Sequence, residues 1–235
     1  MAGNTARITA ADQALIGRLV ECYKRNTHLV DVMLKQISDA IVGSPALMAH
    51  VHSTKWRLKD PEHLRDKLER KLRDAKHHRR AFPLTEKNLL YKVNDLAGIR
   101  ILHLHTQQVP ALDRELRRIF KEYRFRLMEG PKARTWDDES RDFFRSVGIQ
   151  CIKSPRMYTS IHYVLGSNSV TRTTCEVQVR TLAEELWGEV DHAMNYPKES
   201  KIETCREQIK VLARVTSSCS RLVDSIFRAA ERGDQ

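Results

Sequence analysis

The chain has 235 residues, 41% of them hydrophobic and 30% charged, and its formal net charge is +11. This length suits one large domain, or one domain with helical extensions, and the apolar content supports an ordinary core. No apolar run approaches the ~20 residues of a membrane-spanning helix, and residues 1–7 lack the apolar stretch of a signal peptide. We therefore expect a soluble intracellular protein with no membrane partner.

The excess of basic residues indicates a polyanionic partner such as a nucleotide or a nucleic acid. A solvated basic surface explains the charge equally well, so charge alone does not decide. The five cysteines form no C-x-x-C pair, and no zinc-ligand spacing appears among them and the ten histidines. Free thiols in a reducing cytosol are the simplest account, which predicts a cytoplasmic location.

The first predicted element is a long helix. Thr9 is placed to cap it, Asp12 completes a capping box, and apolar residues recur at helical spacing until Gly43 interrupts them. A second helix opens at Asp60, which is followed by a proline and an acid, and runs to about residue 80. Its apolar stripe is thin and its other positions are basic. This pattern predicts a helix that presents a basic face to water or to a ligand.

Farther along the chain, apolar residues change between strand and helix spacing. The predicted strands are 98–105 and 173–180, with weaker candidates near 123–128, 147–152 and 160–166. The predicted helices follow residue 85 and cover 109–123, 181–195 (stopped by Pro197) and 203–231. The polar residues 130–146 are expected to form a loop or a short helical excursion. Strands separated by helices predict an α/β or α+β domain with helical arms at both ends.

The first cluster of chemically active side chains is basic. Arg57 and Lys59 lie just before the second helix, and further cations follow on it at positions 65, 67, 70 and 71. Unpaired backbone amides and side-chain cations converge at such a helix start, which favours an anion. A solvated charge run is the commoner explanation, so this cluster alone is weak evidence.

Two acids lie beside the two strongest strands. Asp95 precedes the strand that carries Arg100, although an acid there can also simply cap a turn. Glu176, Gln178 and Arg180 alternate along the late strand, so their side chains project from one face. Such a row suits a metal-bound phosphate, but a purely structural strand would also show one polar face.

A fourth segment carries Tyr158, Ser160 and His162, which alternate and are predicted to share a strand face. An aromatic ring beside a hydroxyl and an imidazole can stack on a base and bind its sugar or phosphate. By itself the segment would be interpreted as a mixed core strand with a buried tyrosine.

Taken in order, the four segments resemble the synthetase domain of RelA/SpoT-type alarmone synthetases. They are Arg57–Lys67, Asp95–Arg100, Tyr158–His162 and Glu176–Thr181, and the following residues 187–196 are similar to the helix that closes the family's motif. Each motif is modest alone, but four in the family's order are specific. The resemblance covers roughly residues 50 to 200. It divides the chain into an N-terminal helical extension (1–45), a synthetase domain (46–200) and a C-terminal amphipathic helix (201–235).

The resemblance implies a mixed β-sheet flanked by helices, related to nucleotidyltransferases. It also implies a Mg²⁺-dependent pyrophosphokinase that transfers the β,γ-pyrophosphate of ATP to the ribose 3′-hydroxyl of GDP or GTP, making (p)ppGpp and releasing AMP. Asp95 and Glu176 would be the catalytic pair that holds Mg²⁺, and Glu176 would help to deprotonate the hydroxyl. The residues implied to bind ATP are Arg57, Lys59, Lys67 and Arg100. Those implied to bind the acceptor are Tyr158, Ser160, His162, Gln178, Arg180 and His192.

The chain departs from the family pattern at two positions. Met157 replaces the glycine that usually precedes the motif tyrosine, which leaves the identity of the acceptor open. Asp60 replaces a common serine, but Asp caps a helix equally well. The histidine–aspartate pattern of the family's hydrolase half is not evident, so hydrolysis of the product is not expected.

Two alternatives remain open at this stage. Some single-domain relatives are growth-inhibiting toxins that pyrophosphorylate the 3′ end of tRNA or make (p)ppApp, and such a protein could have a neutralising antitoxin as partner. The charge of +11 and Met157 modestly favour this reading. A non-catalytic RNA-binding module is the other alternative, and the presence of both Asp95 and Glu176 argues against it.

The last helix allows two arrangements. Its apolar stripe could pack on its own sheet or on a second copy of the chain. Small members of the family are often tetramers, which favours a homo-oligomer formed through this helix.

Overall fold

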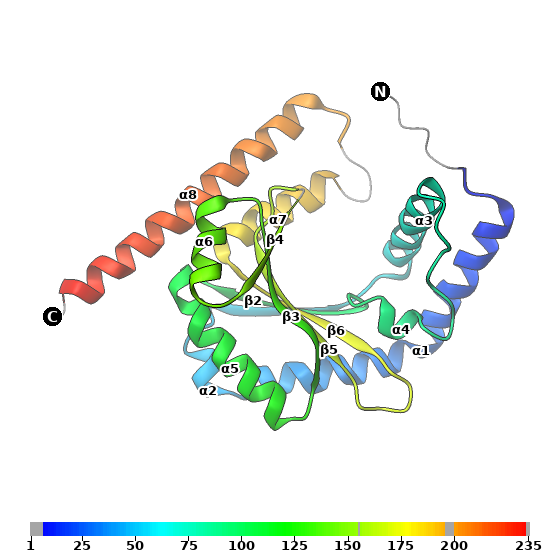
Figure 1. Ribbon diagram of the computed structural model, residues 1–235, viewed down its shortest axis with the longest axis horizontal. Helices are drawn as coiled ribbons and strands as arrows, with labels where there is room; N and C mark the ends of the chain where they lie inside the picture. Colours follow the sequence, from blue (N-terminus) through cyan, green and yellow to red (C-terminus); the bar gives the residue numbers. More distant parts are fainter. Residues whose placement is uncertain (1–6, 155, 196–199, 234–235) are drawn as a thin grey trace.

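The computed structural model describes residues 7–154, 156–195 and 200–233. Within these residues, six strands form one mixed sheet in the order β1-β2-β6-β5-β3-β4 (Figure 1). β2 runs parallel to β6 and β3 runs parallel to β4, whereas the other neighbouring pairs are antiparallel. The strands are β1 (Ser53–Leu58), β2 (Ala97–His103), β3 (Arg126–Thr135), β4 (Gln150–Lys153), β5 (Ser160–Gly166) and β6 (Thr174–Thr181).

Helices flank this sheet, which confirms the predicted fold class. The helix starts that the sequence predicts are formed: Thr9 and Asp12 make the capping box of α1, and the Asp60 carboxylate accepts two backbone amides at the start of α3. The helices are α1 (Ala10–Val42), α2 (Pro45–Met48), α3 (Pro61–His77), α4 (Leu89–Lys92), the 3₁₀ helix η1 (Thr106–Gln108), α5 (Val109–Glu122), α6 (Asp138–Ser146), α7 (Leu182–Asn195) and α8 (Glu203–Gly233).

The N-terminal helix α1 is part of the core. It packs on β1, β2 and β6 and contacts α3. In Figure 1 it lies below the sheet, whereas α7 and α8 lie above it. Its buried Ile16 and Tyr23 join the same apolar cluster as Ile99 of β2 and Val177 of β6. The Tyr23 hydroxyl also donates a hydrogen bond to the backbone oxygen of Lys59 at 2.7 Å, so α1 supports the segment after β1. The domain boundaries near residues 45 and 200 stay predictions.

The structure corrects the sequence-based expectation in two places. Residues 53–58 form the edge strand β1, which we did not predict because its side chains are mostly exposed and show no apolar alternation. Residues 130–135 continue β3, where we expected a loop or a helical excursion. Gly130 takes a positive φ of 108° at a bulge there, and a Cβ would lie 2.4 Å from the backbone oxygen of His162. The strand was missed because the bulge requires a glycine, and a glycine followed by a proline is typical of a loop in sequence. Residues 138–146 form the helix α6, so the helical excursion is confirmed there.

The last helix, α8, packs on α7 through an apolar cluster of Trp187, Ile209 and Ala213, and polar side chains complete its contacts with η1 and the sheet. The Asp224 carboxylate accepts hydrogen bonds from the backbone amide of Thr106, at 2.6 Å, and from its hydroxyl. The hydroxyls of Ser220 and Thr181 lie 3.1 Å apart. Apolar side chains of α8 are instead exposed at Val211, Val215, Leu222 and Ile226. Self-association through this helix stays a prediction.

Two further features bear on the sequence-based predictions. None of the helices in the described part of the chain is long and apolar enough to cross a membrane. The predicted stop at Pro197 lies outside the described residues, and α7 is described as far as Asn195.

A buried acid in the first turn of α7 makes the stability of the fold depend on pH. Glu184 is 6% exposed, and burial raises the pKa of its carboxyl to about 7. The folded state therefore favours the protonated acid, and this contribution to stability is present below pH 4.5 and is lost as the pH rises to about 7. We expect Glu184→Gln to raise the free energy of unfolding by about 2–3 kcal/mol at pH 8 and to change it little at pH 4.5.

Urea unfolding at the two pH values measures this difference. Glu203→Gln, at an exposed acid in the first turn of α8, is the matched control and should change stability little at either pH. If Glu184→Gln stabilises the protein equally at both pH values, the pH dependence does not come from the raised pKa of Glu184.

Candidate functional site

Two adjoining cavities lie at the start of β2 and β6, and both are lined by Asp95 and Glu176. One has a volume of about 530 Å³ and is also lined by Lys67, Tyr158 and His162, among others. The other has a volume of about 370 Å³, and its lining includes Arg57, Arg100, Gln178 and His192. The two predicted acids, 81 positions apart in the sequence (176 − 95), therefore face the same space.

Asp95, in the turn before β2, is held by two lysines. Its carboxylate oxygens lie 2.9 Å from Nζ of Lys59 and 2.5 Å from Nζ of Lys67. Burial opposes ionisation of this carboxyl, but the charges and hydrogen bonds of the two lysines outweigh it and lower the pKa of Asp95 to about 2. The acid is therefore ionised at any physiological pH. Of its two lysines, Lys67 lines the larger cavity, whereas Lys59 is buried and lines neither cavity.

Glu176, on β6, is held by an imidazole and an amide. Its carboxylate accepts from Nδ1 of His162 at 2.9 Å and from Nε2 of Gln178 at 2.8 Å. Burial raises the pKa of Glu176, but these two contacts lower it by more, so the acid stays ionised. Because the carboxylate can only accept, Nδ1 of His162 carries a proton, and Nε2 of His162 lies 3.2 Å from the Tyr158 hydroxyl, which also donates to Oε1 of Gln178 at 3.4 Å. A chain of hydrogen bonds thus connects Tyr158 to Glu176 through His162.

Gly98 has no side chain and forms the floor of the smaller cavity, between Arg57 and Glu176. It lies directly beside Arg57 of β1 and Glu176 of β6 in the sheet register, and it lines the smaller cavity. A Cβ at Gly98 would meet no atom within 4 Å, so the space above it is empty. The sheet therefore presents a cation and an acid on either side of a strip of bare backbone.

The structure brings together most of the predicted acceptor residues but not Ser160. The predicted row on β6 is present, since Nη2 of Arg180 donates to Oε1 of Gln178 at 2.7 Å. The guanidinium carbon of Arg180 lies 5.3 Å from the centre of the Tyr158 ring. Tyr158 itself precedes β5, so of the three residues predicted to share a strand face only Ser160 and His162 lie in the strand. The Ser160 hydroxyl is buried and donates to the backbone oxygen of Val179, because β5 starts at this residue under α7.

Arg100 and Arg180 are both tied to an acid that the sequence did not single out. The buried Glu185 of α7 pairs with Lys55 at 2.9 Å, with Arg100 at 3.1 Å and with Arg180 at 3.2 Å. These cations come from β1, β2 and β6, so one carboxylate connects three strands. Two adjacent acids at the start of a helix look like ordinary helix-dipole partners in sequence, and only the packing of α7 on the sheet distinguishes Glu185.

Gly188, one turn after Glu185, makes room for this arrangement. A Cβ at Gly188 would lie 2.5 Å from Nη1 of Arg180. The guanidinium therefore passes directly beneath α7 on its way to Glu185 and Tyr158. This places Arg180 as a support beneath the tyrosine ring, with its side chain only 4% exposed.

The two acids also suit a divalent cation. Among the described residues no group of three or more His, Cys, Asp or Glu side chains could hold a metal ion. Asp95 and Glu176 nevertheless offer two ionised carboxylates to one space, and Mg²⁺ is often bound by one or two carboxylates together with substrate phosphates and water. The donor set therefore fits Mg²⁺ when a phosphate ligand completes it.

Removal of the buried acid tests the role of Glu185 in this site. Glu185→Ala leaves Arg180 buried without its acidic partner, and we expect it to lower the free energy of unfolding by about 3–5 kcal/mol. Glu189 is the matched control, because it also pairs with Arg100 but its side chain is 52% exposed. Glu189→Ala should cost at most about 1 kcal/mol. Equal losses in the two variants, measured by urea unfolding, would contradict the structural role of Glu185.

Part of this chain matches a known protein family. Residues 56–201 match the family model described as a region found in RelA / SpoT proteins. No curated protein matches the chain. Among solved structures, a GTP pyrophosphokinase family protein from Streptococcus pneumoniae is 17% identical, with a TM-score of 0.55, and the match covers 92% of this chain and 95% of that one.

Small alarmone synthetase 1 from Bacillus subtilis has a similar fold in two complexes. Bound to its product pppGpp, it is 20% identical with a TM-score of 0.53, and the match covers 93% of this chain and 98% of that one. Bound to AMPCPP, it is 15% identical with a TM-score of 0.51, and the match covers 92% and 98%. The TM-scores of these structures, all above 0.5, establish a common fold. Because the family region covers well over half of its length, the chain belongs to the RelA/SpoT family of pyrophosphokinase-type transferases.

Proposed function

We propose that this chain transfers the β,γ-pyrophosphate of ATP to the ribose 3′-hydroxyl of GDP or GTP, making (p)ppGpp. The observation that carries the proposal is the meeting of Asp95 and Glu176 in one space beside Arg57, Lys59 and Lys67. The fold is also that of a small alarmone synthetase, which has been solved with its product pppGpp.

In this proposal the acceptor oxygen attacks the β-phosphorus of ATP. A bond forms between the 3′-oxygen and Pβ, the bond between Pβ and the bridging oxygen to Pα breaks, and AMP leaves with that oxygen. Such a transfer depends mainly on alignment of the two substrates and on neutralisation of charge. Asp95 and Glu176 would hold Mg²⁺, which when bound neutralises charge on the triphosphate.

The lysines and arginines around the floor suit the triphosphate. Lys59 and Lys67 already converge on Asp95, and Arg57 lies across Gly98 from Glu176, so phosphate oxygens above the bare floor would meet cations from two sides. Tyr158 and His162 would then face the acceptor base from the other cavity. Glu176 lines the same cavity and would also take the proton of the 3′-hydroxyl as its oxygen attacks Pβ.

Loss of the Glu176 charge tests the reaction. We expect Glu176→Gln to lower the rate of AMP and (p)ppGpp formation by about 100-fold or more. The reason is that the amide lacks the negative charge of the Glu176 carboxylate beside the reacting phosphates. Labelled ATP is incubated with GDP, GTP, ATP or deacylated tRNA, and the products are separated by chromatography. Glu129→Gln, at a half-exposed acid of β3, is the matched control and should leave the rate unchanged. Unimpaired transfer by Glu176→Gln, or no transfer to any acceptor by the natural chain, would overturn the proposal.

A second candidate acceptor is the 3′ end of tRNA or an adenine nucleotide. Transfer to this acceptor would inhibit growth, and an antitoxin would then be the neutralising partner. This candidate is favoured by additional cations, Arg134 and Lys153, which line the larger cavity beyond Lys67 and extend it along β3 and β4. Cations beyond the length of a nucleotide suit a longer phosphate backbone.

Salt dependence distinguishes the two acceptors. With tRNA as the acceptor, we expect Arg134→Gln and Lys153→Gln each to weaken acceptor binding a few-fold and to reduce the slope of log affinity against log salt concentration by about one. With GDP or GTP as the acceptor, the KM should be nearly unchanged. Exposed Arg126, at the start of β3, supplies the matched control variant Arg126→Gln. Transfer to guanine nucleotides alone would exclude the second candidate.

A further inference from the structure

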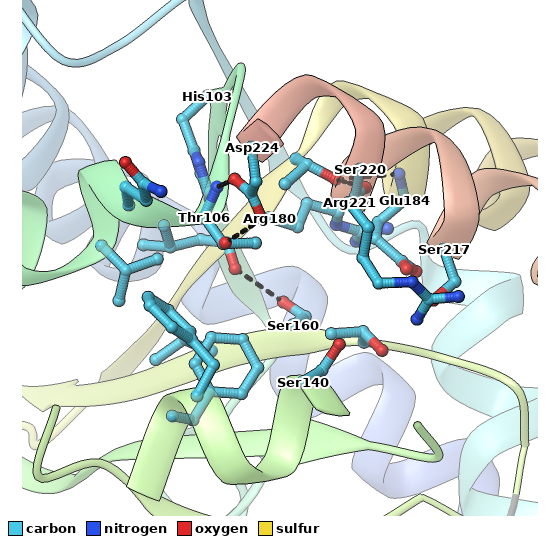
Figure 2. A pocket seen from close by; sticks show the side chains of 18 of the residues that line it. His103, Thr106, Ser140, Ser160, Arg180, Glu184, Ser217, Ser220, Arg221 and Asp224 are labelled. Carbon is cyan, nitrogen blue, oxygen red and sulfur yellow. Dashed lines mark hydrogen bonds between the residues drawn. The ribbon is translucent and has the colours of Figure 1, made fainter. Parts of the chain in front are cut away.

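A third cavity, of about 240 Å³, lies beneath α8 and shares no lining residue with the two cavities of the candidate site. We call it the α8 cavity. It is enclosed by α6, by α8 and by the ends of β2 and β6, and Figure 2 shows the side chains that surround it. Ser160 and Arg180, which the sequence assigned to the acceptor, lie on this cavity.

The walls of the α8 cavity are of two kinds. Five apolar side chains form one wall: Val109, Phe143, Phe144, Ile161 and Val179. The hydroxyls of Ser217 and Ser220 from α8 and the carboxyl of Glu184 from α7 form the other, whereas Ser140 lies on α6 with the two phenylalanines. In Figure 2 the aromatic rings and Ser140 lie on one side of the space, and Ser217, Ser220, Glu184 and Arg221 lie on the opposite side. A flat ring with polar edges would satisfy both walls.

The side of α8 that covers the cavity is unusual for a docking helix. Thr216, Ser217, Ser220 and Asp224 are buried there, whereas an amphipathic helix ordinarily buries apolar side chains. The Nε of Arg180 is buried without a hydrogen-bond partner among the described residues. The serine hydroxyls and Asp224 already have hydrogen-bond partners within the protein, so Nε of Arg180 is the buried group, among the described residues that line the cavity, that a ligand would newly pair.

Two arginines lie at the edge of the cavity. Arg221 is already paired with Asp137 at 3.2 Å and with Glu139 at 3.3 Å. Arg228 lies about two helical turns farther along α8. It is exposed and has no acidic partner in the part of the chain that the structure describes. One uncompensated guanidinium beside a lined cavity favours a ligand with one anionic group.

We propose that the α8 cavity binds a nucleoside monophosphate, with its base between the aromatic wall and the serines and its phosphate at Arg228. Inorganic phosphate would make no use of the apolar wall, and a plain aromatic molecule would leave the serines and Arg228 unused. The volume of about 240 Å³ is below the ~300–1,000 Å³ of pockets for drug-sized ligands, which suits a base with its phosphate outside.

Arg180 connects the α8 cavity to the candidate site. Its side chain lines the cavity, and the same guanidinium donates to Gln178 and lies over Tyr158. A ligand that engages Arg180 would therefore shift the support of the tyrosine ring. If the proposed function holds, an occupied cavity changes the KM for the acceptor more than kcat, but ligand binding itself does not depend on that function.

Calorimetric titration of the full chain with AMP and with GMP tests the site, with adenosine and inorganic phosphate as separate ligands. We expect saturable binding of at least one monophosphate, and clearly weaker binding of adenosine and of phosphate. Arg228→Gln should weaken the monophosphate about tenfold, the loss of one charge-assisted contact. Arg214→Gln, at another exposed arginine of α8 outside the cavity, is the matched control and should bind as the natural chain does.

Two further variants locate the bound ligand. Ser217→Trp fills the cavity and should abolish binding, with circular dichroism to verify the fold. AMP as the reaction product can also bind at the candidate site, so Arg57→Gln should leave unchanged only the component of binding that Arg228→Gln weakens. The proposal is overturned if neither monophosphate binds, if phosphate binds equally well, or if Arg57→Gln weakens binding while Arg228→Gln does not.

Discussion

The parallel pairing of β2 with β6 determines where the chemistry of this protein can occur. In this register Gly98 lies beside Glu176, and Asp95 immediately precedes β2, so both acids come to the same end of the two strands. The antiparallel strand β1 adds Arg57 on the other side of Gly98. A shift of one residue between β2 and β6 would turn Glu176 toward the opposite face, because side chains alternate along a strand.

The buried ion pairs beside the candidate site also hold helices and strands of the fold together. Asp95 is compensated by lysines that come from the end of β1 and from α3, and Glu185 of α7 compensates cations from three strands. A buried ion is costly unless its partner is in place, so these pairs maintain the relative positions of α3, α7 and the sheet. The same pairs orient the side chains that surround the cavities, which is the arrangement needed for a reaction that depends on alignment and electrostatics.

The C-terminal helix contributes in a different way. It leaves apolar side chains exposed and uses hydroxyls and Asp224 to pack on the body of the protein. Its polar side encloses a separate cavity that Arg180 joins to the candidate site, and its outer side remains available for a second copy of the chain or another partner. The polar face of α8 therefore supports the hypothesis of a small-ligand site, and its exposed apolar face supports the separate hypothesis of self-association.

Much of this protein could be predicted from local sequence, because the signals are local in origin. The caps at Thr9 and Asp60, the strand period around Ile99 and Val177, and the order of the four motifs predicted the fold class and the family. The edge strand β1 and the bulge at Gly130 were missed, since an exposed strand has no apolar alternation and a bulge interrupts it.

Within the site, the residue types were determined by sequence and their contacts by packing. Sequence alone identified Asp95, Glu176 and Tyr158 as a set that suits phosphate and base chemistry. Only the tertiary structure decided that Ser160 and Arg180 line the α8 cavity and that Glu185 binds cations from three strands, because these contacts join segments far apart in the chain. Periodicity shows which face of its own element a side chain occupies, but the partner of a buried charge depends on which other element packs against that face.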